Sequence, residues 1–380
     1  MSRVRVPRVG EPIQILGRPL RFSYWPMYRA SRRFGLQSHL YATNPWALIR
    51  ASVQRDCSAA SRAESLAYVA QSEYFFDAAA KSSEWAAKPL LLYYSFMNLS
   101  KAFIVTKAIR ISLDQARHGL AEKLTSGGKE LIDAYLEAHP SPSTQRANVF
   151  ALLWEALSGH VMTSTMRLDL TYLLPQVVTG HRLWCEAADQ KERFMSIESV
   201  QMLQDKATRN LWAVLQMHAG TISQHGIAGS KLLRESGLQG AFRAVRGFHD
   251  ALANEEMLQF EQVQQTRYSH RSSDSVPQLI ESFRHSLFAT AITARPFREY
   301  YLYVAPAQER SQVLPQLLSL FAITYWLGSI TRYRPQQFDR VIESKFGGQL
   351  QEFLSSQPTQ FVYLFASEFA RREITRPPLA

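Results

Sequence analysis

The stretch Ala86–Lys107 constrains the fold more than any other part of the chain; it reads AAKPLLLYYSFMNLSKAFIVTK. Pro89 suits the first helical turn, where its missing N–H costs nothing, and about eighteen residues without Gly or Pro follow it. Ser95, Asn98 and Lys101 interrupt the apolar residues at a helical spacing and form one narrow polar stripe. A helix that is apolar almost all round is typical of a core. We therefore predict a buried helix whose polar stripe faces a partner, a ligand or a water-filled cleft.

Positive charge is concentrated near the N-terminus. The net charge is +11, and residues 1–56 hold ten Arg and two acidic residues, so +8 of that excess lies there. Because the guanidinium group can bind phosphate or carboxylate at two points, the pattern indicates an anionic partner, either nucleic acid or a nucleotide. The alternative is that Arg-rich usage reflects a GC-rich genome and that the charge is merely solvated.

Composition favours a cytoplasmic protein without a cofactor. The longest apolar run, Leu317–Ile330, is shorter than the roughly twenty residues of a membrane span, and no apolar segment follows the basic N-terminus. Cys57 and Cys185 form no CxxC pair, which suits a reducing compartment. Neither HExxH nor His-x3-His occurs, so no metal site is expected, and neither is contact with a membrane.

The apolar pattern predicts a mainly α fold, a multi-helix globular body with a small antiparallel β-sheet insertion. Ile197–Gly220 is predicted to be helical, Pro315–Tyr333 is a second strongly apolar helix, and Met257–Tyr268 has the alternation of a strand. We expect the Pro315 helix to contact the Pro89 helix in the core. The expected domains are a basic irregular N-terminal arm (1–43), a helical body (44–256), a small β-rich element (257–305) and C-terminal helices that pack on the helical body (306–380).

Three segments resemble the bacterial YaaC-like proteins in order and spacing: KPLLLYYSFMNLSKAFIV (Lys88–Val105), ARHGL (Ala116–Leu120) and LFAITYWLGSITRYRP (Leu320–Pro335). In that family a helix with a tyrosine pair and an N/Q-L-x-K-A core is followed by an H-G element, and an apolar helix near the end leads into R-Y-x-P. The resemblance extends from about Trp46 to Ser344. It implies a common fold and assigns no enzymatic activity.

Five polar residues within these segments form the candidate anion-binding site: Asn98, Lys101, His118, Arg332 and Tyr333. An amide, two cations, an imidazole and a phenol could together bind a phosphate. The structural alternative is that Lys101 extends to solvent or pairs with a carboxylate, and that Arg332 caps the end of its helix. Six arginines of the N-terminal arm are the candidates for nucleic-acid binding: Arg3, Arg5, Arg8, Arg29, Arg32 and Arg33.

The predicted function is therefore binding of an anionic partner through an Arg-rich surface, with no catalytic residue assigned. One alternative is a phosphodiester-cleaving enzyme, such as a HEPN-like ribonuclease, with Lys101, His118 and Arg332 as its catalytic residues. Another is an interaction module that forms a homo-oligomer or packs on a partner protein.

Overall fold

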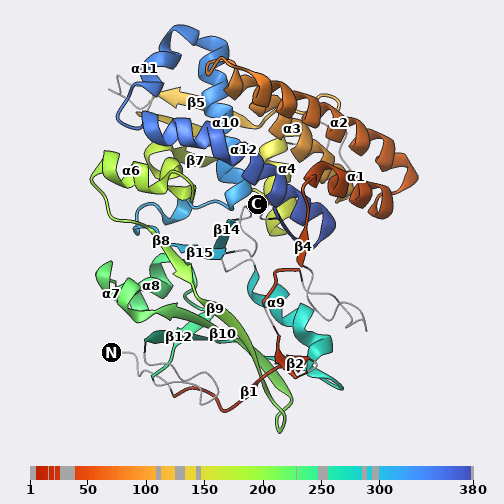
Figure 1. Ribbon diagram of the computed structural model, residues 1–380, viewed down its shortest axis with the longest axis vertical. Helices are drawn as coiled ribbons and strands as arrows, with labels where there is room; N and C mark the ends of the chain where they lie inside the picture. Colours follow the sequence, from red (N-terminus) through yellow and green to blue (C-terminus); the bar gives the residue numbers. More distant parts are fainter. Residues whose placement is uncertain are drawn as a thin grey trace. The chain divides into compact units, whose positions relative to one another are not determined.

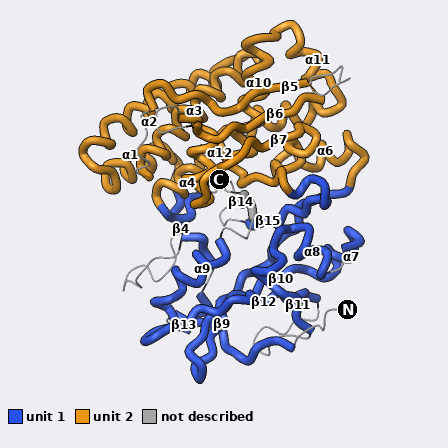
Figure 2. The backbone as a smooth tube through the Cα atoms, turned by 180° about the vertical axis from the view of Figure 1, so that it is seen from behind, with its two compact units in different colours: residues 1–41, 191–310, 371–380 blue, residues 42–190, 311–370 orange. Residues whose placement is uncertain are grey.

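The chain forms two compact units, each built from separate stretches of sequence (Figure 2). Unit 1 contains residues 1–41, 191–310 and 371–380, and unit 2 contains residues 42–190 and 311–370. The computed structural model describes residues 6–15, 17–20, 22–25, 39–107, 113–124, 133–142, 147–227, 229–246, 256–284, 289–292 and 299–377.

Unit 2 is mainly helical, and its longest helices lie side by side (Figure 1). They are α1 (Pro45–Asp56), α2 (Ala59–Lys81), α3 (Lys88–Thr106), α10 (Gln316–Tyr333) and α12 (Gly347–Ala370). Shorter elements complete the unit: α4 (Val149–Ser158), α5 (Leu170–Leu173), η2 (Leu174–Gln176), α6 (His181–Ala188), η6 (Pro335–Gln337) and α11 (Phe338–Ile342). One antiparallel sheet accompanies them, in the order β5 (Leu120–Leu124), β6 (Ala134–Ala138), β7 (Met166–Asp169).

Helix α3 lies at the centre of unit 2, as its apolar composition predicts. It packs against α2, α4, α10 and α12. The contact with α10 is close at Gly328, where a Cβ atom would lie 3.1 Å from Tyr93 Cβ and 3.3 Å from the carbonyl oxygen of Pro89. The predicted contact between the two most apolar helices is therefore confirmed.

Unit 1 is built around an antiparallel sheet in the order β1–β9–β10–β12–β11, with β13 paired to β10. Its strands are β1 (Glu11–Pro12), β9 (Ser199–Asp205), β10 (Asn210–His218), β12 (Met257–Gln262), β11 (Phe242–Ala244) and β13 (Thr266–Arg267). A second sheet has the order β14 (Ala289–Ile292), β15 (Glu299–Tyr303), β8 (Phe194–Ile197). Two pairs of short strands remain, β2 (Gln14–Ile15) with β3 (Arg18–Pro19) and β4 (His39–Tyr41) with β16 (Glu373–Thr375).

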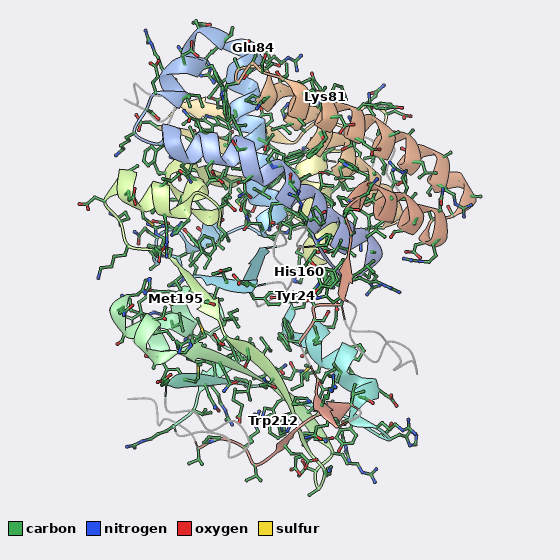
Figure 3. All side chains as sticks on the ribbon, viewed as in Figure 1. Tyr24, Lys81, Glu84, His160, Met195 and Trp212 are labelled. Carbon is green, nitrogen blue, oxygen red and sulfur yellow. The ribbon has the colours of Figure 1, made fainter. Side chains whose placement is uncertain are left out.

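The two faces of the larger sheet carry different side chains. Leu211, Ala213 and Leu215 of β10 join the main core with residues of α7 (Ala219–Gln224), α8 (Gly229–Glu235) and α9 (Val276–Arg284). Trp212 and Val214 point to the opposite face and pack with Leu203. Met195 of the core and Trp212 of the opposite face are labelled in Figure 3. The sheet is therefore apolar on both faces.

The predicted multi-helix body is present, but the mainly α class is confirmed only in part, because the chain has a mixed α/β fold with a six-stranded antiparallel sheet and several small ones. β9 and β10 occupy Ile197–Gly220, which the pattern predicted as helix. A strand that is buried on both faces has no period-2 alternation, so its apolar run resembles that of a buried helix. The strands predicted after residue 256 are present as β12 to β15, but they belong to two sheets and not to one insertion.

Candidate functional site

Three of the five predicted anion-binding residues lie on α10 or in contact with it in unit 2. The His118 ring centroid is 4.7 Å from that of Tyr325, which lies about two turns before Arg332 and Tyr333 on α10. Burial lowers the pKa of His118, and the positive charge of Arg332 acts in the same direction. Burial and the charge of Glu122 raise the pKa of Tyr325, and Tyr333 adds to this effect. The ring contact with Tyr325 thus joins His118 to the helix whose last turn carries Arg332 and Tyr333.

Tyr93 of α3 belongs to the same group, although it was not among the predicted site residues. Its ring contacts Tyr325 edge-on, with centroids 5.7 Å apart. Burial raises the pKa of Tyr93, while the charge of Arg332 acts in the opposite direction. We call Tyr93, His118, Tyr325, Arg332 and Tyr333 the α3–α10 cluster. The tyrosine pair of the family-like motif was the sequence signal that could have identified Tyr93.

The hydrogen bonds of His118 determine which ring nitrogen can meet a ligand. The backbone N–H of Leu120 donates to His118 Nδ1 over 3.1 Å, so Nδ1 has no proton and the neutral ring carries its proton on Nε2. The Tyr325 hydroxyl donates to the carbonyl oxygen of the same Leu120 over 3.0 Å. Burial, assisted by the charges of Arg332 and Arg117, lowers the pKa of His118. The cluster therefore presents a neutral imidazole as an N–H donor.

The carboxylate nearest to the end of α10 is already paired with another arginine. Arg334 forms an ion pair with Glu122 of β5, and Ser329 Oγ donates to the same carboxylate over 2.9 Å. Within the described ranges, Arg332 has no carboxylate partner, and its recorded contact is with the ring of Tyr333, 5.0 Å away. The cluster thus holds a positive charge that the neighbouring side chains do not neutralise.

Lys101 and Asn98 have other neighbours, so the five predicted residues do not form one group. Lys101 Nζ is 3.5 Å from the Leu113 carbonyl oxygen and 5.4 Å from the Tyr68 ring centroid. Burial lowers the pKa of Lys101, while Asp114 and Glu64 raise it. Asn98 is buried, and its amide donates to the Tyr94 carbonyl oxygen of its own helix over 2.9 Å. Lys101 is also about 12 Å along the helix axis from Tyr93.

The lowered pKa of His118 predicts a pH dependence of stability. In the unfolded chain the imidazole has a pKa of about 6.5, so the unfolded state takes up the proton first as the pH falls. The stability provided by neutral His118 should be fully present above that value and should decrease as the pH falls through it. In His118→Asn, Oδ1 can still accept from Leu120 N–H. Urea denaturation at several pH values should show the free-energy difference between wild type and variant shrinking towards acid; a constant difference would contradict this assignment.

Of the six arginines predicted to bind nucleic acid, Arg8 lies in the described residues. Its side chain forms hydrogen bonds and an ion pair within unit 1. Its guanidinium donates to the carbonyl oxygens of Gln262 over 2.7 Å and Val263 over 2.8 Å. It also forms an ion pair with the buried carboxylate of Glu261 over 3.3 Å. Arg3, Arg5, Arg29, Arg32 and Arg33 lie outside the described residues. Arg8 therefore attaches the start of the arm to β12 and the turn that follows it.

The described residues contain neither a cluster of metal-ligand side chains nor a membrane-spanning helix. Among the described residues, no three His, Cys, Asp or Glu side chains gather as metal ligands would. No helix in the ranges that the structure covers combines the length and the apolar character needed to cross a bilayer.

The comparisons with known proteins agree with the segments noted in the sequence. A family model described as YaaC-like Protein matches residues 33–369. That range includes α3, the His118 turn and α10, so it contains the whole α3–α10 cluster. No curated protein and no solved structure matches the chain.

Proposed function

The chain belongs to the YaaC-like protein family, and on that premise we propose that it binds a nucleotide at the α3–α10 cluster. The observation that carries the proposal is the exposed guanidinium of Arg332, which has no carboxylate partner among the described residues and whose charge acts on His118, an Nε2–H donor. The proposed role is binding, and no bond-breaking step is assigned to the cluster.

The polar groups of the cluster suit a phosphate. A guanidinium donates through a planar fork that matches two phosphate oxygens, and hydrogen bonds from a charged group are stronger than neutral ones. The neutral His118 adds a donor without adding a buried charge, while the charged Arg332 is exposed. The hydroxyls of Tyr93 and Tyr333 can each donate one more hydrogen bond. These groups favour an anion that accepts several hydrogen bonds at once.

The aromatic residues of the cluster suit the other half of a nucleotide. The side chain of Tyr333 is 66% exposed, at the end of α10 and next to the guanidinium of Arg332. An exposed ring beside a cation offers a surface on which a base can stack. Tyr93 and Tyr94 continue the aromatic surface along α3, with ring centroids 5.3 Å apart. A phosphate alone would leave these rings without a role.

The other predicted functions have less support. An enzyme that cleaves a phosphodiester would need Lys101 beside His118 and Arg332, but Lys101 lies near Asp114 and Glu64. Nucleic-acid binding through the arm depends on arginines outside the described residues, because Arg8 is held by Glu261. The alternative of an interaction module that packs on a partner protein is not supported by any particular surface among the described residues. We therefore place the nucleotide at the cluster.

Replacing Arg332 tests the proposal. Arg332→Gln should weaken nucleotide binding about 10- to 100-fold, because a hydrogen bond to a charged group contributes about 1.5–3 kcal/mol. Isothermal titration calorimetry with AMP, GMP, ATP and GTP measures this effect. Arg340→Gln is the matched control, since Arg340 is exposed on α11 and the same charge is lost.

His118→Asn should also weaken binding, because Asn can replace the Nδ1 acceptor but not the Nε2–H donor. Tyr93→Phe should reduce affinity less than Arg332→Gln. The proposal is wrong if the wild-type protein binds no nucleotide of the panel, or if Arg332→Gln and Arg340→Gln weaken binding equally.

A further inference from the structure

A cysteine and a histidine form a close pair on α6, far in sequence from the α3–α10 cluster. His181 and Cys185 are four residues apart, so the helix places both side chains on one face. The distance from Cys185 Sγ to His181 Nε2 is 3.3 Å, and both residues are buried. CxxC spacing does not reveal this pair; the available signal was a His four residues before a Cys.

The partner of the other ring nitrogen fixes the tautomer of His181. Nδ1 lies 2.8 Å from the carbonyl oxygen of Pro175, which can only accept a hydrogen bond, so Nδ1 carries the proton. The Nε2 lone pair of the neutral ring then faces Cys185 Sγ. This is the arrangement in which an imidazole can remove a thiol proton. It is the opposite tautomer to that of His118.

A buried polar atom on α12, the helix that packs against α6, gives an independent indication of a site. Gln349 of α12 donates through Nε2 to the carbonyl oxygen of Leu174 over 2.8 Å, while its Oε1 has no hydrogen-bond partner although the residue is 3% exposed. Gln349 Cγ would lie 3.3 Å from a Cβ on Gly180, the residue before His181. Leu174 and Pro175 are consecutive, so Gln349 and His181 are anchored to adjacent carbonyls. A buried oxygen without a donor is expected where a polar group can enter.

We propose that Cys185 and His181 form a reactive thiol–imidazole pair, and that Cys185 is a site of covalent modification by small uncharged electrophiles. The thiol proton moves to His181 Nε2, and the sulfur forms a bond to the electrophilic atom. The bond to the leaving group breaks with its electron pair, and the proton remains on the imidazolium. With iodoacetamide a sulfur–carbon bond forms, a carbon–iodine bond breaks and iodide departs. No oxidant or reductant is required, and the proposal is independent of nucleotide binding.

Three charged residues near the pair could influence how its reactivity depends on pH. Arg182 and Glu186 are on α6 itself, and Glu352 comes from α12, with its Cγ 3.6 Å from the position of a Cβ on Gly180. None of the three lies between Sγ and Nε2, which are in direct contact. The hydrogen bond from His181 Nδ1 to Pro175 also stabilises the protonated ring. The pair should therefore hold a larger thiolate fraction near neutral pH than an ordinary cysteine.

The wild-type protein contains its own control for this chemistry. Cys57 has the same exposed fraction as Cys185, 7%, but burial and the charge of Asp56 raise the pKa of its thiol. The folded protein is treated with iodoacetamide from pH 6 to 8.5, and the modification of each cysteine is followed by peptide mass spectrometry. The rate at Cys57 should rise about tenfold per pH unit, because only the thiolate reacts. The rate at Cys185 should change less than about threefold over the whole range.

The variant His181→Asn tests whether Cys185 reacts because His181 takes its proton or only because reagent can reach it. The Asn amide can still donate to Pro175 but cannot take the thiol proton, so Cys185 should then react about tenfold faster per pH unit, as Cys57 does. Circular dichroism checks that the variant is folded. The proposal is overturned if wild-type Cys185 follows the same pH slope as Cys57. It is also overturned if Cys185 reacts only after the protein is unfolded in urea.

Discussion

Replacing Glu261 by Ala is expected to lower the free energy of unfolding by about 3–5 kcal/mol. Glu261 is fully buried in β12, and its carboxylate accepts hydrogen bonds from the backbone N–H of Arg8 over 2.9 Å and from Arg243 Nε over 3.0 Å. Both guanidinium groups form ion pairs with it. Removing the carboxylate would leave two largely buried cations facing each other, which costs much more than the loss of an exposed pair.

The matched control is Glu11→Gln in the same unit. Glu11 of β1 pairs with Lys206, but both side chains are at least half exposed, so the change should cost less than about 1 kcal/mol. Urea denaturation followed by circular dichroism gives the two free energies. Hydrogen exchange of β9 and β10 then reports whether unit 1 is the part that opens. Equal costs for the two substitutions would show that Arg8 and Arg243 do not depend on Glu261.

The helices of unit 2 could be predicted because local signals and burial agree. Asn44 precedes Pro45 and has a residue type that favours helix caps, and its Oδ1 accepts from the N–H of Ala47 over 3.0 Å. Pro89 lies in the first turn of α3, as predicted. The Pro315 helix begins where the sequence indicated, with Pro315 as its cap. Asn44 satisfies an N–H group at a helix start, and proline fits the first turn, where no hydrogen bond from its nitrogen is needed; such signals are visible in sequence.

The large sheet of unit 1 could not be predicted from such local signals in the sequence. β10 reads NLWAVLQMH, and seven of its nine residues are buried because both faces are covered. The turn between β9 and β10 could have been predicted from Asp205. The Asp205 carboxylate accepts from the N–H of Ala207 over 2.8 Å and from the Thr208 hydroxyl over 2.6 Å, and Arg209 has a φ of 55°. Asp is favoured in such turns. The pairing of β1 with β9 joins residues far apart in sequence, which no local pattern encodes.

The candidate site was predictable in part for a similar reason. The sequence identified His118, Arg332 and Tyr333 as polar residues next to apolar helices, and the packing of the His118 turn and β5 on α10 joins them in the structure. Lys101 was expected to share the site because it lies on α3, but it points to Tyr68 and Leu113. A helical period gives the angle between side chains on one helix. It does not say which neighbouring element each side chain will meet.

Replacing Phe96 by Ala is the second change with a large expected effect, about 3–5 kcal/mol of unfolding free energy. Phe96 of α3 is 1% exposed, and its ring stacks on that of Phe361 of α12 with centroids 3.5 Å apart and an interplanar angle of 9°. Removing the ring leaves a cavity between two helices whose backbones are held by many other contacts. Collapse around the cavity should therefore be incomplete, and most of the lost packing should appear as lost stability.

The double variant Phe96→Ala with Phe361→Ala shows whether the two rings act as one contact. Each single change should cost about 3–5 kcal/mol, and the double variant should cost less than their sum by about 0.5–3 kcal/mol, since the second truncation removes a ring that has already lost its partner. Phe96→Leu is the conservative control and should cost less than Phe96→Ala, because it fills more of the cavity. Urea denaturation of the four proteins supplies the cycle. Additivity within about 0.5 kcal/mol would mean that the rings are energetically independent, and α12 would then be held to α3 by its other contacts.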